Sequence, residues 1–434
     1  MKAYILRSGL TISPFQDPPG EARVLDRPAR ERQAEMLRRL GLETVPIDRV
    51  EEIRDSEFVL FPDYVYFSLS CLRGFLKAVA RHRQSRRLAL EDNPQTQLSL
   101  PMQELSPYPP QRQGGPPVFG FDLYYWNGPD FRPEATATLP PEVVPLKQRL
   151  VEVDPPFYVR VKEKVRIGLS RTYCMHIKHW SHIYLLNYAA LTGLPFEWFP
   201  RKLPWLLWRV LTAFSLNPFK IMRRLVIKGK RCSIHPTAIV EASVLGDRVS
   251  IGAHAVVRGS YIGEGARVGE AAKVMGCVIG QKSEISWHSV VNLCVLYPHS
   301  CVGVPGVQTA LLGREAYLSS MTMPLDVKFK GGYVSVRHRG RTVTTRLTTL
   351  GPCLGHRSRI GAGVMINCGR EIPNDVDILP SPVSMLSKIP DGLAPGSYMI
   401  ENGTLVPIDL SEGTKEKDGA AGDGCPASGP PGAA

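Results

Sequence analysis

Two histidines and a group of basic residues in the C-terminal half are the side chains whose types could support chemistry. An imidazole exchanges a proton near neutral pH, so His288 and His299 are candidates for a general base. A basic group between residues 328 and 341 could bind phosphate through charge-assisted hydrogen bonds. Its members are Lys328, Lys330, Arg337, Arg339 and Arg341. The alternative for both sets is a solvated position on the exterior, where such side chains most often lie.

The charge of the whole chain favours an anionic partner. The formal net charge is +13 at pH 7, which attracts phosphates, nucleotides, coenzyme A or acidic membranes. Charge alone does not exclude nucleic acid, although no nucleic-acid partner is expected. The 434 residues, 43% hydrophobic and 21% charged, predict a folded protein of two or three domains.

The cysteines and the apolar segments indicate the compartment. Nine cysteines occur without a C-x-x-C pair, which argues against a disulfide framework or a zinc ribbon and favours a reducing cytosol. The first apolar run is too short for a signal peptide because Arg7 ends it. Prolines and Arg209 interrupt the longest apolar stretch, 203–219, so no membrane-spanning helix is expected. We therefore predict a cytoplasmic protein.

A repeat of aliphatic residues decides the architecture of the C-terminal half. From Ile234 onward they recur at spacings of 6, 6 and 5, a period of 17 residues. The rows are Ile234, Ile251, Val268, Ile285 and Val302; Val240, Val257, Val274 and Val291; and Leu245, Ile262, Ile279 and Leu296. Three short strands per turn would place these side chains inside a triangular prism, which is a parallel β-helix.

Stacked turns lie about 4.8 Å apart, so equivalent positions form ladders of like side chains. Ser243, Ser260, Cys277 and Cys294 form one such ladder, which predicts a packing role for the two cysteines. The repeat returns from Leu354 to Ile378. Between the two blocks, 324–350 breaks the period and is predicted to form a hairpin outside the prism.

The N-terminal half shows an alternating order of strands and helices. Met1–Gly9, 44–47 and 58–63 are expected strands, and helices are expected before Gly41 and from about Leu69 to Arg81. This order predicts an α/β domain with a parallel sheet. It resembles the start of the sugar-1-phosphate nucleotidyltransferases, in which a glycine-rich loop holds triphosphate and a strand-end aspartate binds magnesium. The resemblance implies those roles for the Gly9 loop and for Asp63.

The phosphate loop departs from that family's pattern. The family loop reads roughly G-x-G-x-R followed by a P-K pair, whereas Gly9 is followed by Leu-Thr-Ile-Ser-Pro without a second glycine, the arginine or the lysine. Backbone approach to phosphate needs such glycines, and a cation is needed to neutralise the leaving pyrophosphate. We therefore expect a degenerate nucleotidyltransferase-like domain, with Mg²⁺ bound at Asp63 only if this domain is active.

Three further segments complete the expected organisation. Residues 92–118, rich in proline and glutamine, are predicted to be an exposed insertion. Residues 201–231 combine tryptophans with nine cations and predict a linker helix, which could alternatively contact an anionic membrane surface. Residues 411–434 are predicted to be a disordered tail. The domain scheme is thus 1–200, the linker 201–231, the β-helix 232–410 and the tail.

The C-terminal repeat resembles the left-handed β-helix acyltransferases, which usually trimerise and bind acyl-coenzyme A between subunits. The segments Leu312–Leu318 and Cys368–Ile372 resemble the archaeal type of bifunctional sugar-1-phosphate nucleotidyltransferase and acetyltransferase. Trp180 to Asn187 resembles the segment that closes this family's nucleotidyltransferase domain. The resemblance implies acetyl-coenzyme A or another acyl-coenzyme A as cofactor, and a homotrimer. It also implies that the basic hairpin residues Lys328, Lys330, Arg339 and Arg341 contact the phosphates of coenzyme A.

The resemblance also locates the catalytic base. Aligned coils place Trp287 at the position of the family's histidine and His288 one place later. An alternative alignment places Gly303 to Gly306 there. The first hypothesis is therefore an acyltransferase for a sugar or nucleotide-sugar in envelope polysaccharide metabolism, with His288 as base. The second is a catalytically silent subunit that binds sugar nucleotides.

Overall fold

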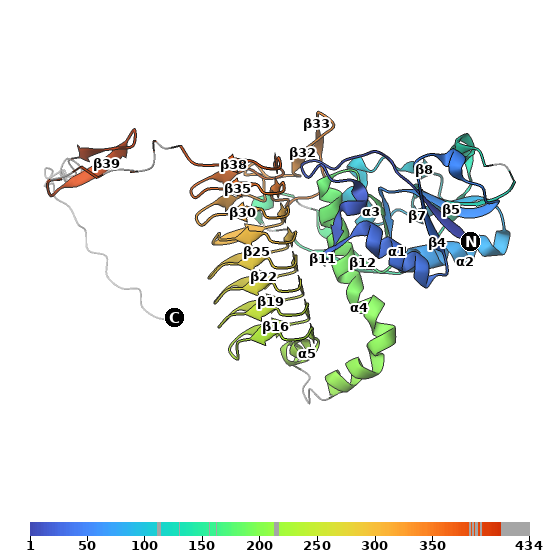
Figure 1. Cartoon of the computed structure of the whole chain (residues 1–434), viewed down its shortest axis with the longest axis horizontal. Coiled ribbons are helices and arrows are strands. Elements are labelled where there is room, and N and C mark those ends of the chain that lie inside the picture. Colours follow the sequence, from blue (N-terminus) through green and yellow to red (C-terminus); the bar gives the residue numbers. More distant parts are fainter. Residues whose placement is uncertain are drawn as a thin grey trace, which may run out of the picture. The chain divides into compact units, whose positions relative to one another are not determined.

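The structure is a computed structural model that describes residues 1–408 except 111–113, 130, 156, 162, 212–216, 382, 384–385, 387–388 and 391–392. The chain divides into one compact unit, Met1–Leu379, and a second unit that begins at Pro380. Figure 1 shows the element order within the first unit. The second unit contains a hairpin of β39 (Ser397–Glu401) and β40 (Thr404–Ile408). The predicted tail, 411–434, lies outside the described residues.

The N-terminal part is an α/β region built on one mixed sheet. Its strand order is β10 (Pro141–Val143), β7 (Arg86–Glu91), β9 (Val118–Asn127), β5 (Glu57–Pro62), β1 (Lys2–Leu6) and β4 (Glu43–Ile47), with β8 (Ser106–Tyr108) beside β9. β1 runs parallel to β4 and β5. The three strands expected from the sequence are thus parallel, as predicted. β9 is not among them; it runs antiparallel to β5, β7 and β8 and makes the sheet mixed.

The helices of this region form where the sequence has apolar faces. α1 (Ala29–Arg39) follows β3 (Arg27–Pro28), and α2 (Leu69–His82) follows β6 (Val65–Phe67). In α2 the buried side chains are Cys71, Leu72, Phe75 and Val79, a spacing that gives one apolar face. The Ser68 hydroxyl caps α2 by accepting a hydrogen bond from the Cys71 amide.

Part of the predicted exposed insertion is buried instead. Within 92–118, α3 (Pro94–Ser99) is capped by Asn93, whose side chain accepts a hydrogen bond from the Thr96 amide. Gln103 is fully buried and its Oε1 accepts a hydrogen bond from the His176 amide at 3.0 Å. Because these polar groups are paired, a segment rich in proline and glutamine can lie inside the domain.

The C-terminal part is a left-handed parallel β-helix made of three sheets. The helix-facing sheet comprises β14 (Ile227–Lys228), β17 (Val244–Leu245), β20 (Tyr261–Ile262), β23 (Val278–Ile279), β26 (Val295–Leu296), β29 (Leu311–Leu312), β34 (Cys353–Leu354) and β37 (Glu371–Ile372). The exposed sheet comprises β15 (Ser233–Ile234), β18 (Ser250–Ile251), β21 (Arg267–Val268), β24 (Glu284–Ile285), β27 (Cys301–Val302), β30 (Tyr317–Leu318), β35 (Arg359–Ile360) and β38 (Asp377–Ile378). The third sheet comprises β16 (Ile239–Glu241), β19 (Val256–Arg258), β22 (Lys273–Met275), β25 (Val290–Asn292) and β28 (Gly306–Gln308), followed by the pair β31 (Met323–Pro324) and β36 (Met365–Ile366).

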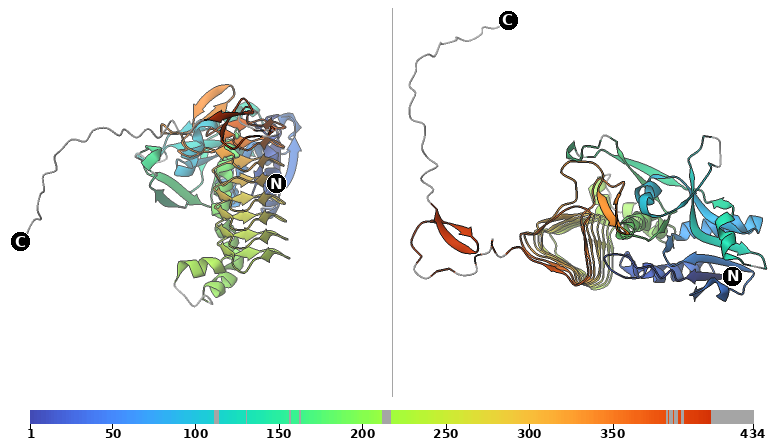
Figure 2. Two further views of the ribbon diagram at one scale, coloured as in Figure 1. Left: turned by 90° about the vertical axis from the view of Figure 1, so that its left-hand side faces the viewer. Right: turned by 90° about the horizontal axis from the view of Figure 1, so that it is seen from above.

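The coils stack in the predicted register. Ile234 pairs with Ile251, Val240 with Val257, and Leu245 with Ile262. The aliphatic rows line the interior of the β-helix, and the end-on view in Figure 2 shows its triangular section. Small residues close the corners, where Ala255, Ala272 and Ser289 are buried.

The serine and cysteine ladder has the predicted packing role. The Ser260 amide donates to the Ser243 hydroxyl, and the Cys277 amide donates to the Ser260 hydroxyl, at 3.1 and 3.0 Å. Cys277 and Cys294 are free and buried. Burial raises the pKa of the Cys277 thiol to about 12, so this thiol stays protonated and unreactive at neutral pH.

The β-helix is interrupted once and ends earlier than predicted. The hairpin expected in 324–350 is present as β32 (Ser335–His338) and β33 (Arg341–Thr344). The final strand of the exposed sheet is β38, and the second unit begins at Pro380. The predicted end at residue 410 therefore included a hairpin that does not continue the coils, because its two strands pair only with each other.

A long helix joins the α/β region to the β-helix. α4 (Trp180–Leu211) continues through the first part of the predicted linker and is followed by α5 (Pro218–Arg224). Most side chains of 195–219 lie outside the described residues, so the membrane-contact hypothesis for 201–231 stays a prediction. Within the described chain, no helix has the length and apolarity needed to cross a bilayer.

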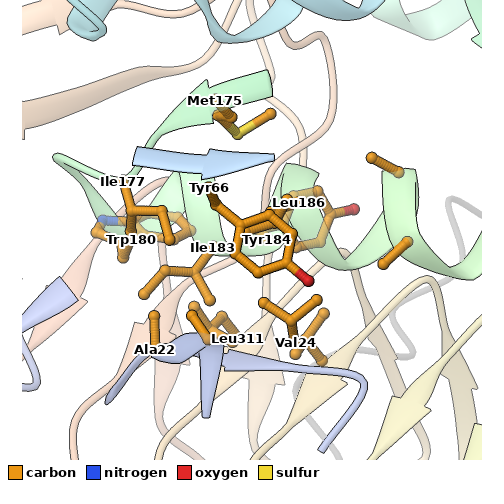
Figure 3. Close-up of a cluster of buried hydrophobic side chains, with 14 of the residues drawn as sticks. Ala22, Val24, Tyr66, Met175, Ile177, Trp180, Ile183, Tyr184, Leu186 and Leu311 are labelled. Carbon is orange, nitrogen blue, oxygen red and sulfur yellow. The ribbon is translucent and has the colours of Figure 1, made fainter. Parts of the chain in front are cut away.

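The first half of α4 packs against the outer surface of the helix-facing sheet. Trp180, Ile183 and Leu186 share one buried cluster with Leu311 of the β-helix and Val24 of the N-terminal region (Figure 3). The cluster also contains outward-facing residues of the same sheet: Val278, Val295, Leu311 and Cys353. This sheet is therefore apolar on both faces, whereas the exposed sheet carries polar residues outward.

The segment between β2 (Arg23–Val24) and β3 also attaches to the β-helix. Asp26 Oδ2 accepts a hydrogen bond from the Gln281 amide at 2.8 Å, and the Arg23 amide donates to the Tyr297 hydroxyl at 2.9 Å. Burial raises the pKa of Asp26 to about 6, although the charge of Arg23 and the Gln281 amide act in the opposite direction. The Asp26 carboxylate thus lies in a partly desolvated contact between the N-terminal region and the β-helix.

Removing this charge should stabilise the joint at neutral pH. Asp26 binds a proton more readily folded than unfolded, so its contribution to stability falls as pH rises from about 4 to about 6 and stays low above that range. We expect Asp26→Asn to raise the free energy of unfolding by about 2–3 kcal/mol at pH 7.5 relative to wild type. The gain should shrink towards pH 4.

Urea unfolding of both proteins at pH 4.5 and 7.5 measures this difference. Asp48→Asn is the matched control, because Asp48 pairs with Arg7 on the exposed surface. An Asp26→Asn effect that does not change with pH would contradict the explanation.

Candidate functional site

The structure places Asp63 beside the start of the loop that the resemblance assigned to nucleotide. Asp63 follows β5, and its Oδ1 accepts hydrogen bonds from the Ser8 amide at 3.2 Å and the Ser8 hydroxyl at 2.5 Å. Gly9 follows with a positive φ of 67°. Among the described residues, no group of three or more His, Cys, Asp or Glu side chains could share a metal ion. Ser8 thus engages one of the two carboxylate oxygens of Asp63, and magnesium binding at this residue stays a prediction.

The loop beyond Gly9 is attached to the β-helix. The Ser13 hydroxyl donates to Glu371 Oε2 at 2.6 Å, and the Asn374 amide group donates to the Phe15 carbonyl at 2.7 Å. The Phe15 ring stacks on Tyr297 at 5.3 Å between centroids. A phosphate-binding loop must present free amides to its ligand, whereas this loop makes structural contacts between the two parts of the unit.

A partly buried ionic cluster anchors the same loop. Arg314 Nη2 contacts both carboxylate oxygens of Asp17 at 2.9 Å. His356 Nδ1 accepts a hydrogen bond from the Arg314 amide, so its Nε2 carries the proton and donates to Asp17 Oδ2 at 3.0 Å. Burial acts to raise the pKa of Asp17, but the hydrogen bond from His356 and the charge and hydrogen bonds of Arg314 outweigh it, so the pKa is lowered.

A pocket opens where this loop, the end of β13 (Cys174–His176), the hairpin and the last coils meet. We call it the junction pocket; its volume is ≈ 580 Å³. Its lining includes Lys178, His179, Arg337, His338, Arg339, Arg370 and Glu371. Sequence reasoning missed this pocket as a whole, because its residues come from segments as distant as Leu10 and Glu371. Arg337 and Arg339 were predicted to bind phosphate and do line it, whereas Lys328, Lys330 and Arg341 do not.

The histidines beside the junction pocket are neutral at pH 7. Burial lowers the pKa of His179 to about 3, and neighbouring His338 acts in the same direction. Burial also lowers the pKa of His338, as does the charge of Arg339. The two rings lie 5.5 Å apart, edge to face. Burial lowers the pKa of His176 to about 4, so the histidines on this side of the fold contribute no positive charge.

The predicted base His288 lies on a corner of the β-helix. It has a positive φ of 58°, and its amide donates to the Glu270 carbonyl at 3.0 Å. Its side chain is exposed, and the described chain offers it no hydrogen bond or ion pair. Trp287 beside it is 75% exposed. The roles of Trp287 and His288 remain predictions.

His299 lies on a different corner and lines a groove. The groove has a volume of ≈ 540 Å³ and runs along the last coils of the exposed sheet, and we call it the coil groove. Its lining also includes Cys301, Glu315, Tyr317, Arg359 and Asp377. The stacking of coils explains this grouping, because Cys301, Tyr317, Arg359 and Asp377 are paired neighbours in successive strands.

The hairpin cations are distributed over several environments. Lys328 Nζ donates to the Ser335 hydroxyl at 3.0 Å, and Arg339 Nη1 donates to Glu104 Oε1 at 2.6 Å. Lys330 and Arg341 are exposed. The predicted cluster is thus divided: Arg337 and Arg339 line the junction pocket, whereas Lys328, Lys330 and Arg341 do not.

Comparison with known proteins agrees with the fold. Residues 219–309 match a protein family described as the GMPPB C-terminal domain. No curated protein matches the chain. The β-helix is similar to a candidate acetyltransferase from Bacillus cereus, with 16% identity over 35% of this chain and 76% of that chain at a TM-score of 0.20.

Two further solved structures are similar to part of this chain. A hexapeptide transferase family protein from Anaplasma phagocytophilum shares 16% identity over 37% of this chain and 81% of that chain, with a TM-score of 0.18. The acetyltransferase domain of PglB from Neisseria gonorrhoeae shares 16% over 36% of this chain and 55% of that chain, with a TM-score of 0.13. TM-scores this low support no inference about activity. The stacked coils define the class, a hexapeptide-repeat β-helix protein, and the matched domain covers residues 219–309 of it.

The Asp17 cluster should contribute to the stability of the loop attachment. Asp17→Asn leaves Arg314 and His356 without their carboxylate, so we expect the free energy of unfolding at pH 7 to fall by about 1–3 kcal/mol. The lowered pKa of Asp17 means that its contribution is present above about pH 4 and is lost as pH falls further.

Asp375→Asn is the matched control, because Asp375 pairs with Arg357 on the exposed surface and should cost less than about 1 kcal/mol. Urea unfolding at pH 7 compares the two variants. Equal losses would show that burial adds nothing to the Asp17 cluster.

Proposed function

We propose that the protein is an acyl-coenzyme-A-dependent acyltransferase for a sugar or nucleotide-sugar acceptor. The observation that carries the proposal is the coil groove, which combines an exposed imidazole with carboxylates, a phenol and a guanidinium on an otherwise regular β-helix. The acyltransferase resemblance of the repeat supports the same reaction class. The proposal that the protein acts in envelope polysaccharide metabolism is based on that resemblance alone.

The reaction needs a base, and His299 supplies one in the coil groove. The acceptor amine or hydroxyl attacks the acyl carbon, an N–C or O–C bond forms, and the C–S bond of the thioester breaks. His299 takes the acceptor proton and returns it to the departing thiolate, a transfer suited to imidazole near neutral pH. Arg359 in the groove provides a positive charge for phosphate groups of either substrate.

The proposal also includes a homotrimer. Within one subunit the coil groove is open to solvent on one side, so it cannot enclose acyl-coenzyme A by itself. The resemblance places acyl-coenzyme A between subunits. The exposed apolar side chains Trp287, Met321, Met323 and Met365 follow the corner and the third sheet beside the groove. A neighbouring subunit that covered them would reduce the apolar surface in contact with water.

Histidine variants test the mechanism. We expect His299→Ala to lower kcat/KM by about 100-fold or more, the usual contribution of a general base. Coenzyme A release from acetyl-coenzyme A is measured with a thiol-reactive dye and a panel of amino-sugar phosphates and nucleotide-sugars. His288→Ala tests the original assignment in the same assay.

His254→Ala is the control, because His254 has a positive φ of 56° at the corner that carries His288. Loss of turnover in His288→Ala but not in His299→Ala would return the base to His288. Unchanged turnover in both variants would overturn base catalysis by either histidine.

A second candidate function is a catalytically silent subunit that binds sugar nucleotides. It is favoured by the attachment of the loop beyond Gly9 to the β-helix through Ser13 and Asp17. This candidate predicts that a nucleotide-sugar raises the melting temperature while no acceptor supports coenzyme A release. Steady turnover by the purified protein alone would contradict it.

A further inference from the structure

The junction pocket has an excess of positive charge. Four cationic side chains, Lys178, Arg337, Arg339 and Arg370, line it together with one carboxylate, Glu371. The adjacent histidines add no charge at neutral pH because burial keeps them unprotonated. A pocket of this composition attracts anions.

Two of the four cations have no hydrogen-bond or ion-pair partner for their guanidiniums within the described part of the chain. Lys178 and Arg339 both pair with Glu104, at 2.7 and 2.6 Å. In contrast, no hydrogen bond or ion pair from the described residues reaches the guanidinium of Arg337 or Arg370. Each of these groups can therefore offer its full set of N–H donors to a ligand.

A polar atom of the hairpin is also unsatisfied. His338 Nε2 is buried without a hydrogen-bond partner, and the residue lines the pocket. A buried nitrogen of this kind costs free energy unless something pairs with it. A ligand oxygen or hydroxyl in the pocket could complete this pairing.

We propose that the junction pocket binds a small molecule that carries a pyrophosphate group, with Arg337 and Arg370 as its principal contacts. Two planar guanidiniums suit two linked phosphates, because each can make paired N–H···O bonds with one of them. The volume of ≈ 580 Å³ leaves room for more than the pyrophosphate itself. Pyrophosphate occurs in nucleoside diphosphates, nucleotide-sugars and coenzyme A alike.

This site differs from both sites considered above. Asp63 and Gly9 do not line it, and neither does any residue of the coil groove, although Leu10, Thr11 and Ser13 of the loop beyond Gly9 form part of its wall. Its cations come from the hairpin and the last coils, joined by Lys178 before α4. It is therefore a composite site that exists because the two parts of the unit meet there. The test of ligand binding to the junction pocket is therefore independent of the acyl-transfer experiments.

Calorimetric titration of the full-length protein tests the proposal with inorganic pyrophosphate, ADP, UDP and coenzyme A, in buffer without divalent cations. We expect pyrophosphate to bind and to compete with ADP. Arg337→Gln and Arg370→Gln should each weaken pyrophosphate binding by at least about tenfold, as loss of a charge-assisted hydrogen bond implies. Arg341→Gln is the matched control, because Arg341 lies on the same hairpin, is exposed and does not line the pocket.

A variant that is expected to increase the affinity for pyrophosphate separates the effect on binding from a folding defect, because a misfolded protein would not bind more tightly. Glu371→Gln removes the one carboxylate of the lining and keeps an oxygen that can accept the hydrogen bond from Ser13, so it should tighten pyrophosphate binding. Competition by coenzyme A or by UDP identifies which pyrophosphate compound the site accepts. Absence of pyrophosphate binding, or equal affinity in wild type and both arginine variants, would overturn the proposal.

Discussion

The parallel register between consecutive coils is the constraint on which the rest of this structure depends. Each coil pairs with the next one residue for residue, for example Val268 with Ile285. Interior aliphatic rows, closed corners and outward ladders all follow from this pairing, because a change of one residue would move side chains from the interior to the surface. The coil groove is a direct result, since it gathers side chains from successive strands of one ladder.

The outer face of the helix-facing sheet sets the second level of organisation. Its outward residues are apolar and lie against α4, so the α/β region cannot be displaced without exposing them. This attachment brings the loop after Gly9 to the end of the β-helix, where Asp17, Arg314 and His356 form a partly buried cluster. The same loop therefore contributes to the joint between the α/β region and the β-helix.

The chemistry of the junction follows from unequal pairing of charges. Glu104 pairs with both Lys178 and Arg339 and so offsets one of their two positive charges. Arg337 and Arg370 have no hydrogen-bond or ion-pair partner for their guanidiniums among the described residues. Buried histidines next to them stay neutral because desolvation penalises the imidazolium. A stable fold retains unpaired guanidiniums most easily where water or a ligand can reach them, and the pocket provides that access.

The sequence by itself determined the β-helix, because a period of 17 residues with aliphatic rows is compatible with few other packings. It also predicted the hairpin, the Asp63 strand end and the packing role of Cys277. An available signal was missed: the row Val244, Tyr261, Val278 and Val295 repeats with the same period, and its apolar character marks the sheet that α4 covers. Only the tertiary structure decided that β9 is antiparallel, that Gln103 is buried and that Lys178, Arg337 and Arg370 line one pocket. These outcomes depend on contacts between distant segments, and local periodicity carries no information about which segments meet.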